Sequence, residues 1–140
     1  MTTVKKEKIM IFGTFDFLHK GHLHFFQQAR KLSKNPFLVV SVARDINVKK
    51  IKGQLPLQKE NERVREIKKC PLVDRVVLGG LKNYIPHIKK ERPDIIALGY
   101  DQIAYTENLQ KNLAKHGLVI KISRLKSYKP HVYKSSILKK

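Results

Sequence analysis

The sequence is poor in cysteine, in acidic residues and in long apolar runs. Its 140 residues include one cysteine, Cys70, so no internal disulfide can form, which suits a reducing cytosol. The N-terminal region holds an apolar run of just four residues, 9–12, and no stretch is long enough for a secretory signal or a membrane span. We therefore expect a soluble, cytoplasmic protein with no membrane partner.

Acidic residues are scarce, since 11 Asp and Glu stand against 30 Lys and Arg and give a formal net charge of +19. Such a charge suggests nucleic-acid binding. The lysines, however, are spread over nearly every segment, without a dominant basic tract or interleaved aromatic residues. We favour a general lysine preference or a field that attracts anionic nucleotides, and we keep nucleic-acid contact as the less favoured alternative.

The remaining composition is that of a globular chain. Apolar residues make up 41% of the sequence, too many for a disordered segment. A chain of this length can bury a core without disulfides or metals, and no linker, repeat or low-complexity tract divides it. We expect a single domain over residues 1–140.

Strand-like and helix-like patterns alternate along the chain. Short apolar segments predict five strands, at 8–12, 37–43, 75–78, 94–98 and 118–122. Amphipathic segments predict four helices, at 21–33, 60–69, 84–91 and 106–116. The lysine-rich stretch 44–59, which contains Gly53 and Pro56, is interpreted as a loop of functional length. The alternation predicts an α/β fold, a doubly wound five-stranded parallel sheet with flanking helices.

The expected strand order is 3-2-1-4-5, which reverses between the first and the fourth strand. Ligands of such sheets bind beyond the carboxyl ends of the strands, at the reversal. The first strand runs directly into segment 13–22, and the fourth runs into segment 99–102. We therefore expect these two segments to face one crevice.

Segment 13–22 (GTFDFLHKGH) has the residues of an anion site. Gly13 and Gly21 allow close approach of backbone and ligand, and the N–H groups of a helix start carry partial positive charge. His19 and His22 share one face of a helical turn, and both can donate to phosphate oxygens. Phosphoryl-type transfer needs mainly positioning and charge stabilisation. From the residues alone, a pair of surface histidines and a metal site stay open as alternatives, although no second ligand cluster is evident.

The strings GTFD at 13–16 and HKGH at 19–22 resemble the HxGH signature of the cytidylyltransferase-like nucleotidyltransferases. The likeness continues with Arg63, ten residues before the Val-Asp pair 73–74, and with 93–102, which is similar to the family's PD…GxD segment. The resemblance implies a Rossmann-like fold. It also implies that a nucleoside triphosphate is joined to a phosphorylated acceptor, with release of pyrophosphate.

Three features are similar to archaeal-type FAD synthases: 43–45 (ARD) with 52–53 (KG), 99–102 (GYDQ) and 124–128 (RLKSY). They imply transfer of AMP from ATP to FMN, giving FAD and pyrophosphate. The alternative is a CTP-dependent cytidylyltransferase acting on glycerol 3-phosphate or a similar phosphorylated alcohol, whose family shares most of the pattern. A basic nucleic-acid-binding module on the same fold is the non-enzymatic alternative. The tail 133–137 looks like the family's terminal Ser/Thr-rich motif but lacks a clear RTxGISTT string.

The resemblance assigns the triphosphate to the first segment. His19 and His22 would hold it and stabilise the reacting α-phosphate. Asp16 would orient the loop or a histidine, or would act as a local cap. Phe15 is either a nucleotide contact or a core residue. The other positions expected to touch the nucleotide, partly through backbone, are Gly13, Thr14 and Gly21.

Further roles fall outside that segment. Lys52 would bind a substrate phosphate, with Lys49 as a weaker candidate and a solvated lysine as the alternative. Arg63 would fork onto phosphate oxygens, with a surface ion pair on its helix as the alternative. Asp101 would bind the ribose or base edge, and Tyr128 would pack beside the base or the flavin. Lys52 and Arg63 complete the predicted catalytic set with the two histidines.

No protein cage for Mg²⁺ is visible in the sequence, and Mg²⁺ usually keeps waters and is carried on substrate phosphates. We expect Mg²⁺ or another divalent cation on the triphosphate, with no metal ligands from the chain. The expected partners are ATP or CTP and a phosphorylated acceptor such as FMN. Because relatives of this kind are often dimers, we also expect a homodimer.

Overall fold

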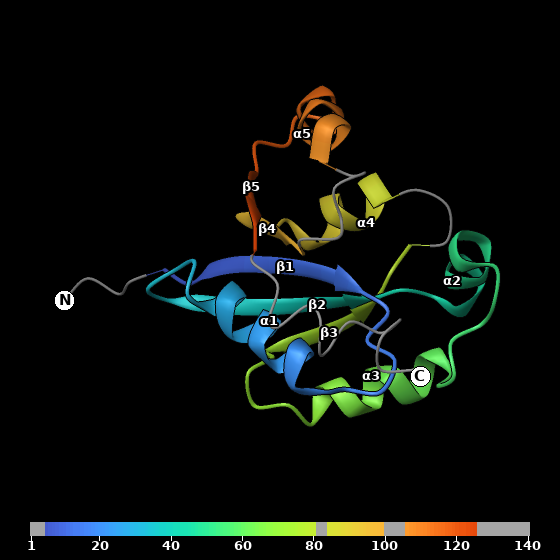
Figure 1. Cartoon of the computed structure of the whole chain (residues 1–140). Helices are drawn as coiled ribbons and strands as arrows, with labels where there is room; N and C mark the ends of the chain where they lie inside the picture. Colours follow the sequence, from blue (N-terminus) through green and yellow to red (C-terminus); the bar gives the residue numbers. More distant parts are fainter. Residues whose placement is uncertain (1–4, 81–83, 100–105, 126–140) are drawn as a thin grey trace.

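A computed structural model describes residues 5–80, 84–99 and 106–125 (Figure 1). The predicted contacts Asp101 and Tyr128 and the tail 133–137 lie outside these ranges. Within them, one parallel sheet has the order β3-β2-β1-β4-β5, so the predicted topology is confirmed. The strands are β1 Glu7–Gly13, β2 Pro36–Val42, β3 Arg75–Leu78, β4 Ile95–Leu98 and β5 Lys121–Arg124.

Helices cover both faces of this sheet. In Figure 1, α1 and α3 lie on one face and α4 and α5 on the other, while α2 stands beyond the arrowheads of β1 and β2. The helices are α1 Lys20–Arg30, α2 Asp45–Lys52, α3 Glu60–Lys68, α4 Tyr84–Glu91 and α5 Thr106–Lys115. The Rossmann-like, doubly wound layer arrangement is therefore as expected.

One helix occupies a stretch that the sequence analysis interpreted as a loop. α2 ends at Gly53, which has a φ of 81° and stands in the left-handed region that glycine adopts without steric cost. Lysine is itself a good helix former. The prediction was wrong because it weighed the polarity of 44–59 and overlooked a glycine placed as a C-terminal cap.

The last strand also begins later than predicted, at Lys121 instead of residue 118. The N–H of Leu118 bonds the carbonyl of Leu113 at 2.9 Å, so this residue takes part in the C-terminal cap that follows α5. Gly117, with a φ of 75°, allows that reversal of the chain. The apolar pattern located the strand, but the cap of the preceding helix set its start.

The core consists of two clusters, one on each face of the sheet. Ile9 and Ile11 of β1 pack with residues of α1 and α3, whereas Met10, between them, packs with residues of α4 and α5. All three side chains are fully buried. Cys70 is buried in the first cluster as filling. Helices thus cover β1 on both faces. Since β1 ends at Gly13, the chain leaves it at the carboxyl edge of the sheet.

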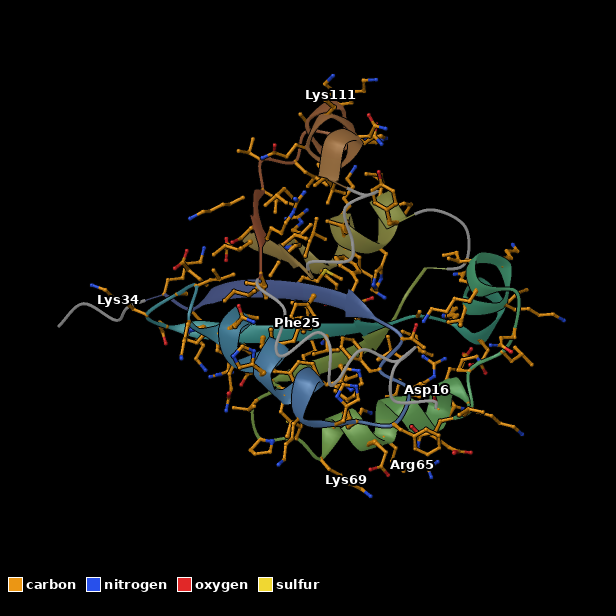
Figure 2. All side chains as sticks on the ribbon, viewed as in Figure 1. Asp16, Phe25, Lys34, Arg65, Lys69 and Lys111 are labelled. Carbon is orange, nitrogen blue, oxygen red and sulfur yellow. The ribbon has the colours of Figure 1, made fainter. Side chains whose placement is uncertain are left out.

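The described residues include no helix with the length and apolarity that crossing a membrane requires. Basic side chains are distributed around the molecule. Figure 2 labels Lys34, Lys69 and Lys111 at three separate edges, and all three are exposed. These three lysines therefore do not share one face of the molecule.

Candidate functional site

The loop after β1 folds back over its own start. A Cβ at Gly13 would lie 2.7 Å from the ring of Phe15, so only glycine fits there. The Phe15 side chain is 5% exposed and packs against Phe26, which answers the alternative left open by the sequence: its ring belongs to the core. Phe15 and Phe17 have φ values of 54° and 52°, a strained region for such residues. Strain of this kind costs about 1–3 kcal/mol per residue and clusters at functional sites.

Two histidines cap the start of α1. The Nδ1 atom of His19, the N-cap residue, accepts the N–H of Gly21 at 3.0 Å. In return, the Nδ1 atom of His22 accepts the N–H of His19 at 3.3 Å. The rings stack with centroids 3.8 Å apart and planes inclined by 25°. The edge of Phe15 supports the His22 ring at 5.4 Å. This is a capping box in which imidazoles take the place of the usual Ser and Glu.

The capping bonds also fix where each imidazole carries its proton. Since each Nδ1 accepts a backbone N–H, the neutral rings carry hydrogen on Nε2. Burial lowers the pKa of His22 to about 3, helped by the neighbouring His19 and opposed by the negative charge of Asp16. Burial also lowers the pKa of His19. At neutral pH, both rings are therefore neutral Nε2–H donors at the positive end of a helix dipole.

The first turn of α1 contains no acidic residue. Carboxylates are otherwise favoured at this position of a helix, because they neutralise its partial positive charge. Here that charge is left to a ligand, and an anion such as phosphate suits it. The structure thus brings together His19, His22, Gly13 and Gly21 as the sequence predicted, while their contact with a nucleotide stays a prediction.

Asp16 ties the loop to a distant segment. Its carboxylate accepts the N–H of Leu57 at 2.7 Å and the N–H of Gln58 at 2.9 Å. The side chain of Gln58 in turn accepts the N–H of Phe17 at 2.9 Å. Figure 2 shows Asp16 beyond the arrowhead of β1, near α3. Of the roles weighed for Asp16, orientation of the loop agrees with these contacts.

Arg63 lies inside this framework, with a side chain that is 0% exposed. Its NH1 group donates to the carbonyl oxygens of Thr14 and Ala43, each at 2.8 Å. Its Nε donates to the carbonyl of Gln58 at 3.1 Å, and its NH2 pairs with Asp45 at 2.6 Å. These contacts do not match a surface ion pair. They make Arg63 a positioning group for the loop, and its contact with phosphate stays a prediction.

Lys52, the last residue of α2, reaches back to the same loop. Its Nζ lies 3.5 Å from the Oγ1 of Thr14, and its side chain is exposed. A cation thus lies near Thr14, in the loop that leads from β1 to the two histidines. Lys49 is also exposed on α2, one turn earlier. The sequence had placed Lys52 in a loop, and the structure instead fixes it to a helix end.

Two carboxylates of this region have a capping role that the sequence analysis did not assign to them. Asp45 and Glu60 are the first residues of α2 and α3, and each side chain bonds the backbone N–H of the other residue. An acidic residue at the start of each helix was the available signal. Because 44–59 was predicted to be a loop, Asp45 was not recognised as the first residue of a helix.

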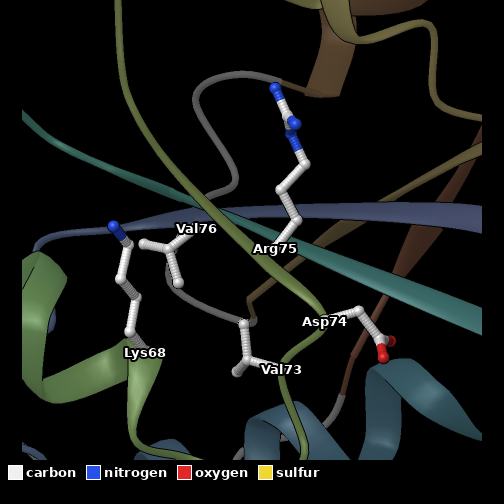
Figure 3. Close-up of a pocket in the computed structure, with 5 residues that line it drawn as sticks. All are labelled: Lys68, Val73, Asp74, Arg75 and Val76. Carbon is white, nitrogen blue, oxygen red and sulfur yellow. The ribbon is translucent and has the colours of Figure 1, made fainter.

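A shallow hollow of about 400 Å³ lies at the other edge of the sheet (Figure 3). It opens at Arg75, where β3 begins, beside the end of α3. Asp74, at its rim, is engaged by Arg30 and by the N–H of Leu38. No predicted site residue lines it; its walls are Lys68, Val73, Asp74, Arg75 and Val76. The residues that the structure describes contain no group of three or more His, Cys, Asp or Glu placed to hold a metal ion.

A parallel sheet of order 3-2-1-4-5, with an HxGH segment at the start of the first helix, is the architecture of a Rossmann-like nucleotidyltransferase. The chain belongs to the cytidylyltransferase-like family, whose sequence profile matches residues 10–140.

Similar proteins carry two kinds of name. The FAD synthase of Methanosarcina barkeri is 44% identical over 118 residues, which are 84% of this chain and 82% of that protein. The FAD synthase of Thermoplasma volcanium is 37% identical over 133 residues, 95% and 92% of the two chains. A crystal structure described as the lipopolysaccharide core biosynthesis protein of Thermoplasma volcanium superposes with a TM-score of 0.81 at 37% identity, covering 88% of this chain and 98% of that one.

Proposed function

We propose that this nucleotidyltransferase transfers AMP from ATP to FMN, giving FAD and pyrophosphate. The observation that carries the transfer chemistry is the start of α1, where two neutral imidazoles cap a helix without an acidic first turn. The choice of acceptor is supported by the similarity to FAD synthases over most of the chain.

In the proposed reaction, a phosphate oxygen of FMN attacks the α-phosphorus of ATP in line. The new O–P bond forms as the bond from the α-phosphorus to the bridging oxygen breaks, and pyrophosphate leaves. His19 and His22 donate their Nε2–H groups to triphosphate oxygens and stabilise the charge that develops on the α-phosphate and the leaving group. Backbone contacts come from Gly13, Thr14, Phe15 and Gly21.

Lys52 binds the phosphate of the acceptor in this scheme, because its Nζ stands 3.5 Å from Thr14, beside the triphosphate segment. Arg63 positions the loop through the carbonyls of Thr14 and Ala43. Asp101 holds the ribose or base edge and Tyr128 packs beside the base or the flavin, as the resemblance implies. A divalent cation carried on the triphosphate neutralises part of its charge.

Exposed apolar side chains beside the site favour a flavin acceptor over a phosphorylated glycerol. Leu57 is 73% exposed and Phe17 is 55% exposed, and the bonds of Asp16 and Gln58 hold their two segments together. A flavin ring system offers a broad apolar surface to such residues, whereas glycerol 3-phosphate offers none. The same part of the chain also exposes Ile46, Ile51 and Leu55.

The test is incubation of the purified protein with ATP, FMN and Mg²⁺, followed by chromatographic measurement of FAD. FAD is expected with wild-type protein, and at a rate about 10²–10³-fold lower with His19→Ala. Absence of FAD above that control would sink the proposal. Pyrophosphate release with CTP and glycerol 3-phosphate, but not with ATP and FMN, would identify the cytidylyltransferase alternative. Salt-dependent RNA binding without turnover of any nucleotide would identify the binding module.

We further propose that the protein acts as a homodimer, as family relatives often do. Sedimentation equilibrium measures the mass directly. A single species with the mass of one chain at the concentrations of the activity assay would overturn this part of the proposal without touching the reaction.

A further inference from the structure

The helices α2 and α3 begin head to head. Their N-cap residues, Arg44 and Lys59, make no side-chain cap bond. Instead, the side chain of Glu60 accepts the N–H of Asp45 at 2.9 Å, and the side chain of Asp45 accepts the N–H of Glu60 at 3.2 Å. We call this pair of bonds the reciprocal cap. Each carboxylate satisfies a backbone donor of the other helix and lies at the positive end of both dipoles.

The reciprocal cap is fastened to the triphosphate loop. The second carboxylate oxygen of Asp45 accepts from the NH2 of Arg63 at 2.6 Å. The same guanidinium donates to the carbonyls of Thr14 and Ala43. Glu60 also faces Arg44 at 3.7 Å, and Arg44 donates to the carbonyl of Gly79 at the end of β3. The first turn of α2 is therefore held from several sides by groups of the protein itself.

The other end of α2 carries Lys52. The helix has eight residues, so Lys52 lies about 10 Å along the axis from Asp45. A rotation of α2 about the reciprocal cap is thus converted into a displacement of the Lys52 ammonium relative to Thr14. A displacement of about 1 Å at a reacting or binding group is enough to cost up to about 10²-fold.

We propose that Asp45 and Glu60 are positioning residues for the acceptor, because through the reciprocal cap and Arg63 they hold Lys52 where it meets the acceptor phosphate. The inference rests on the proposed function, in which that phosphate belongs to FMN. Neither carboxylate touches a substrate. The histidine pair is held more directly, by its own capping bonds and by the ring of Phe15, so we expect the ATP site to depend less on the reciprocal cap than the position of Lys52 does.

The test compares Asp45→Asn and Glu60→Gln with Glu62→Gln. Glu62 stands in the same first turn of α3, is exposed and loses the same charge, so it is a matched control. The dissociation constant of FMN is measured by quenching of its fluorescence, and the KM of ATP is measured in FAD synthesis. We expect FMN binding about tenfold weaker in the first two variants, a KM of ATP within about twofold of wild type, and no change in Glu62→Gln.

A double-mutant cycle separates positioning from general loss of structure. In a Lys52→Ala background, Asp45→Asn should weaken FMN binding by less than about twofold, because the group it positions is gone. Effects that add in full, or variants that lose thermal stability while binding FMN like wild type, overturn the inference. Glu60→Gln keeps the test valid if Asp45→Asn does not fold, since Glu60 does not pair with the buried Arg63.

The two proposals fail in different ways. Wild-type protein that binds FMN without forming FAD overturns the proposed reaction, and the cycle on FMN affinity still decides the inference. FAD formation together with unchanged FMN binding in Asp45→Asn and Glu60→Gln overturns the inference alone. Wild-type protein that neither binds FMN nor forms FAD overturns both.

Discussion

The start of α1 and the starts of α2 and α3 use the same backbone feature in opposite ways. Every helix start carries partial positive charge and unpaired N–H groups. In α2 and α3, Asp45 and Glu60 neutralise that charge within the protein. In α1, two neutral imidazoles satisfy part of the backbone, and no acid occupies the first turn. The fold thus neutralises two of these three helix starts with its own carboxylates, and the start of α1 is the one at which we propose that an anion binds.

The two regions also depend on each other. Arg63 pairs with Asp45 at the start of α2 and donates to the carbonyl of Thr14 in the loop before α1. Asp16 adds a second connection, to Leu57 and Gln58 just before α3. Ion pairs and hydrogen bonds within the protein thus hold the loop and the starts of α2 and α3 together. No acidic side chain in the first turn of α1 neutralises the partial positive charge of that helix start.

The largest expected effect is a loss of activity when either histidine at the start of α1 is removed. His19→Ala and His22→Ala should each lower kcat/KM by about 10²–10³-fold, because each removes a donor to charge that develops in the transition state. Steady-state FAD synthesis measures this. The control is His116→Ala, an exposed histidine at the end of α5, which should leave kcat/KM within about twofold. Losses below about tenfold for both site histidines would contradict the proposed role.

The second prediction concerns removal of the Arg63 guanidinium, which pairs with Asp45 at the start of α2. Arg63→Met keeps much of the side-chain volume but leaves the Asp45 carboxylate and three carbonyls without their donor. The free energy of unfolding should fall by about 3 kcal/mol, measured by urea denaturation. Arg65→Met, on the exposed side of the same helix (Figure 2), should change it by less than about 0.5 kcal/mol. Equal effects of the two substitutions would refute the positioning role.

The third prediction uses pH. The pKa of His22 is about 3 in the folded protein and 6.5 in its ordinary state, so between these values the unfolded chain binds more protons. This contribution to stability is complete above pH 6.5 and is lost as the pH falls toward 3, by at most about 1.4 kcal/mol per pH unit.

Urea unfolding at pH 7, 6 and 5 should therefore show a steeper loss of stability for wild type than for His22→Gln. The other histidines are present in both proteins, so the difference between the two slopes reports His22 together with its coupling to His19. Parallel slopes would show that His22 is not held neutral by burial.

The smallest effect sharpens the comparison by making α1 resemble its neighbours. Lys20→Glu places an acid at the first residue of α1, an exposed position. The carboxylate should stabilise the fold by about 0.3–1 kcal/mol through the helix dipole. It should also raise the KM of ATP about fivefold, because it competes with the triphosphate for the same helix start. Thermal unfolding and FAD synthesis give the two readouts, with Lys20→Gln as the neutral control. A KM that stays unchanged in Lys20→Glu would contradict an anion site at this helix start.

The sequence by itself determined the alternation of strands and helices, which follows from local apolar patterns. The order of the sheet was predicted together with the resemblance to a Rossmann-like family, because the handedness of βαβ units is compatible with more than one strand order. The sequence also determined the pairing of His19 with His22, since residues three apart share a helical face. The misplaced start of β5 and the overlooked α2 show the limit, because both depended on how a glycine closes a helix.

Only the tertiary structure decided which distant groups meet. Arg63 reaches Thr14 across 49 positions of sequence, and Asp45 reaches Glu60 across 15. An arginine in an amphipathic helix is ordinarily an exposed residue, and nothing local marks it for burial. Its environment is set by the way β1 and β2 end side by side, which brings two carbonyls and one carboxylate to the same point. The residues that we propose to bind the anion could be read from the sequence, whereas the framework that holds them required the fold.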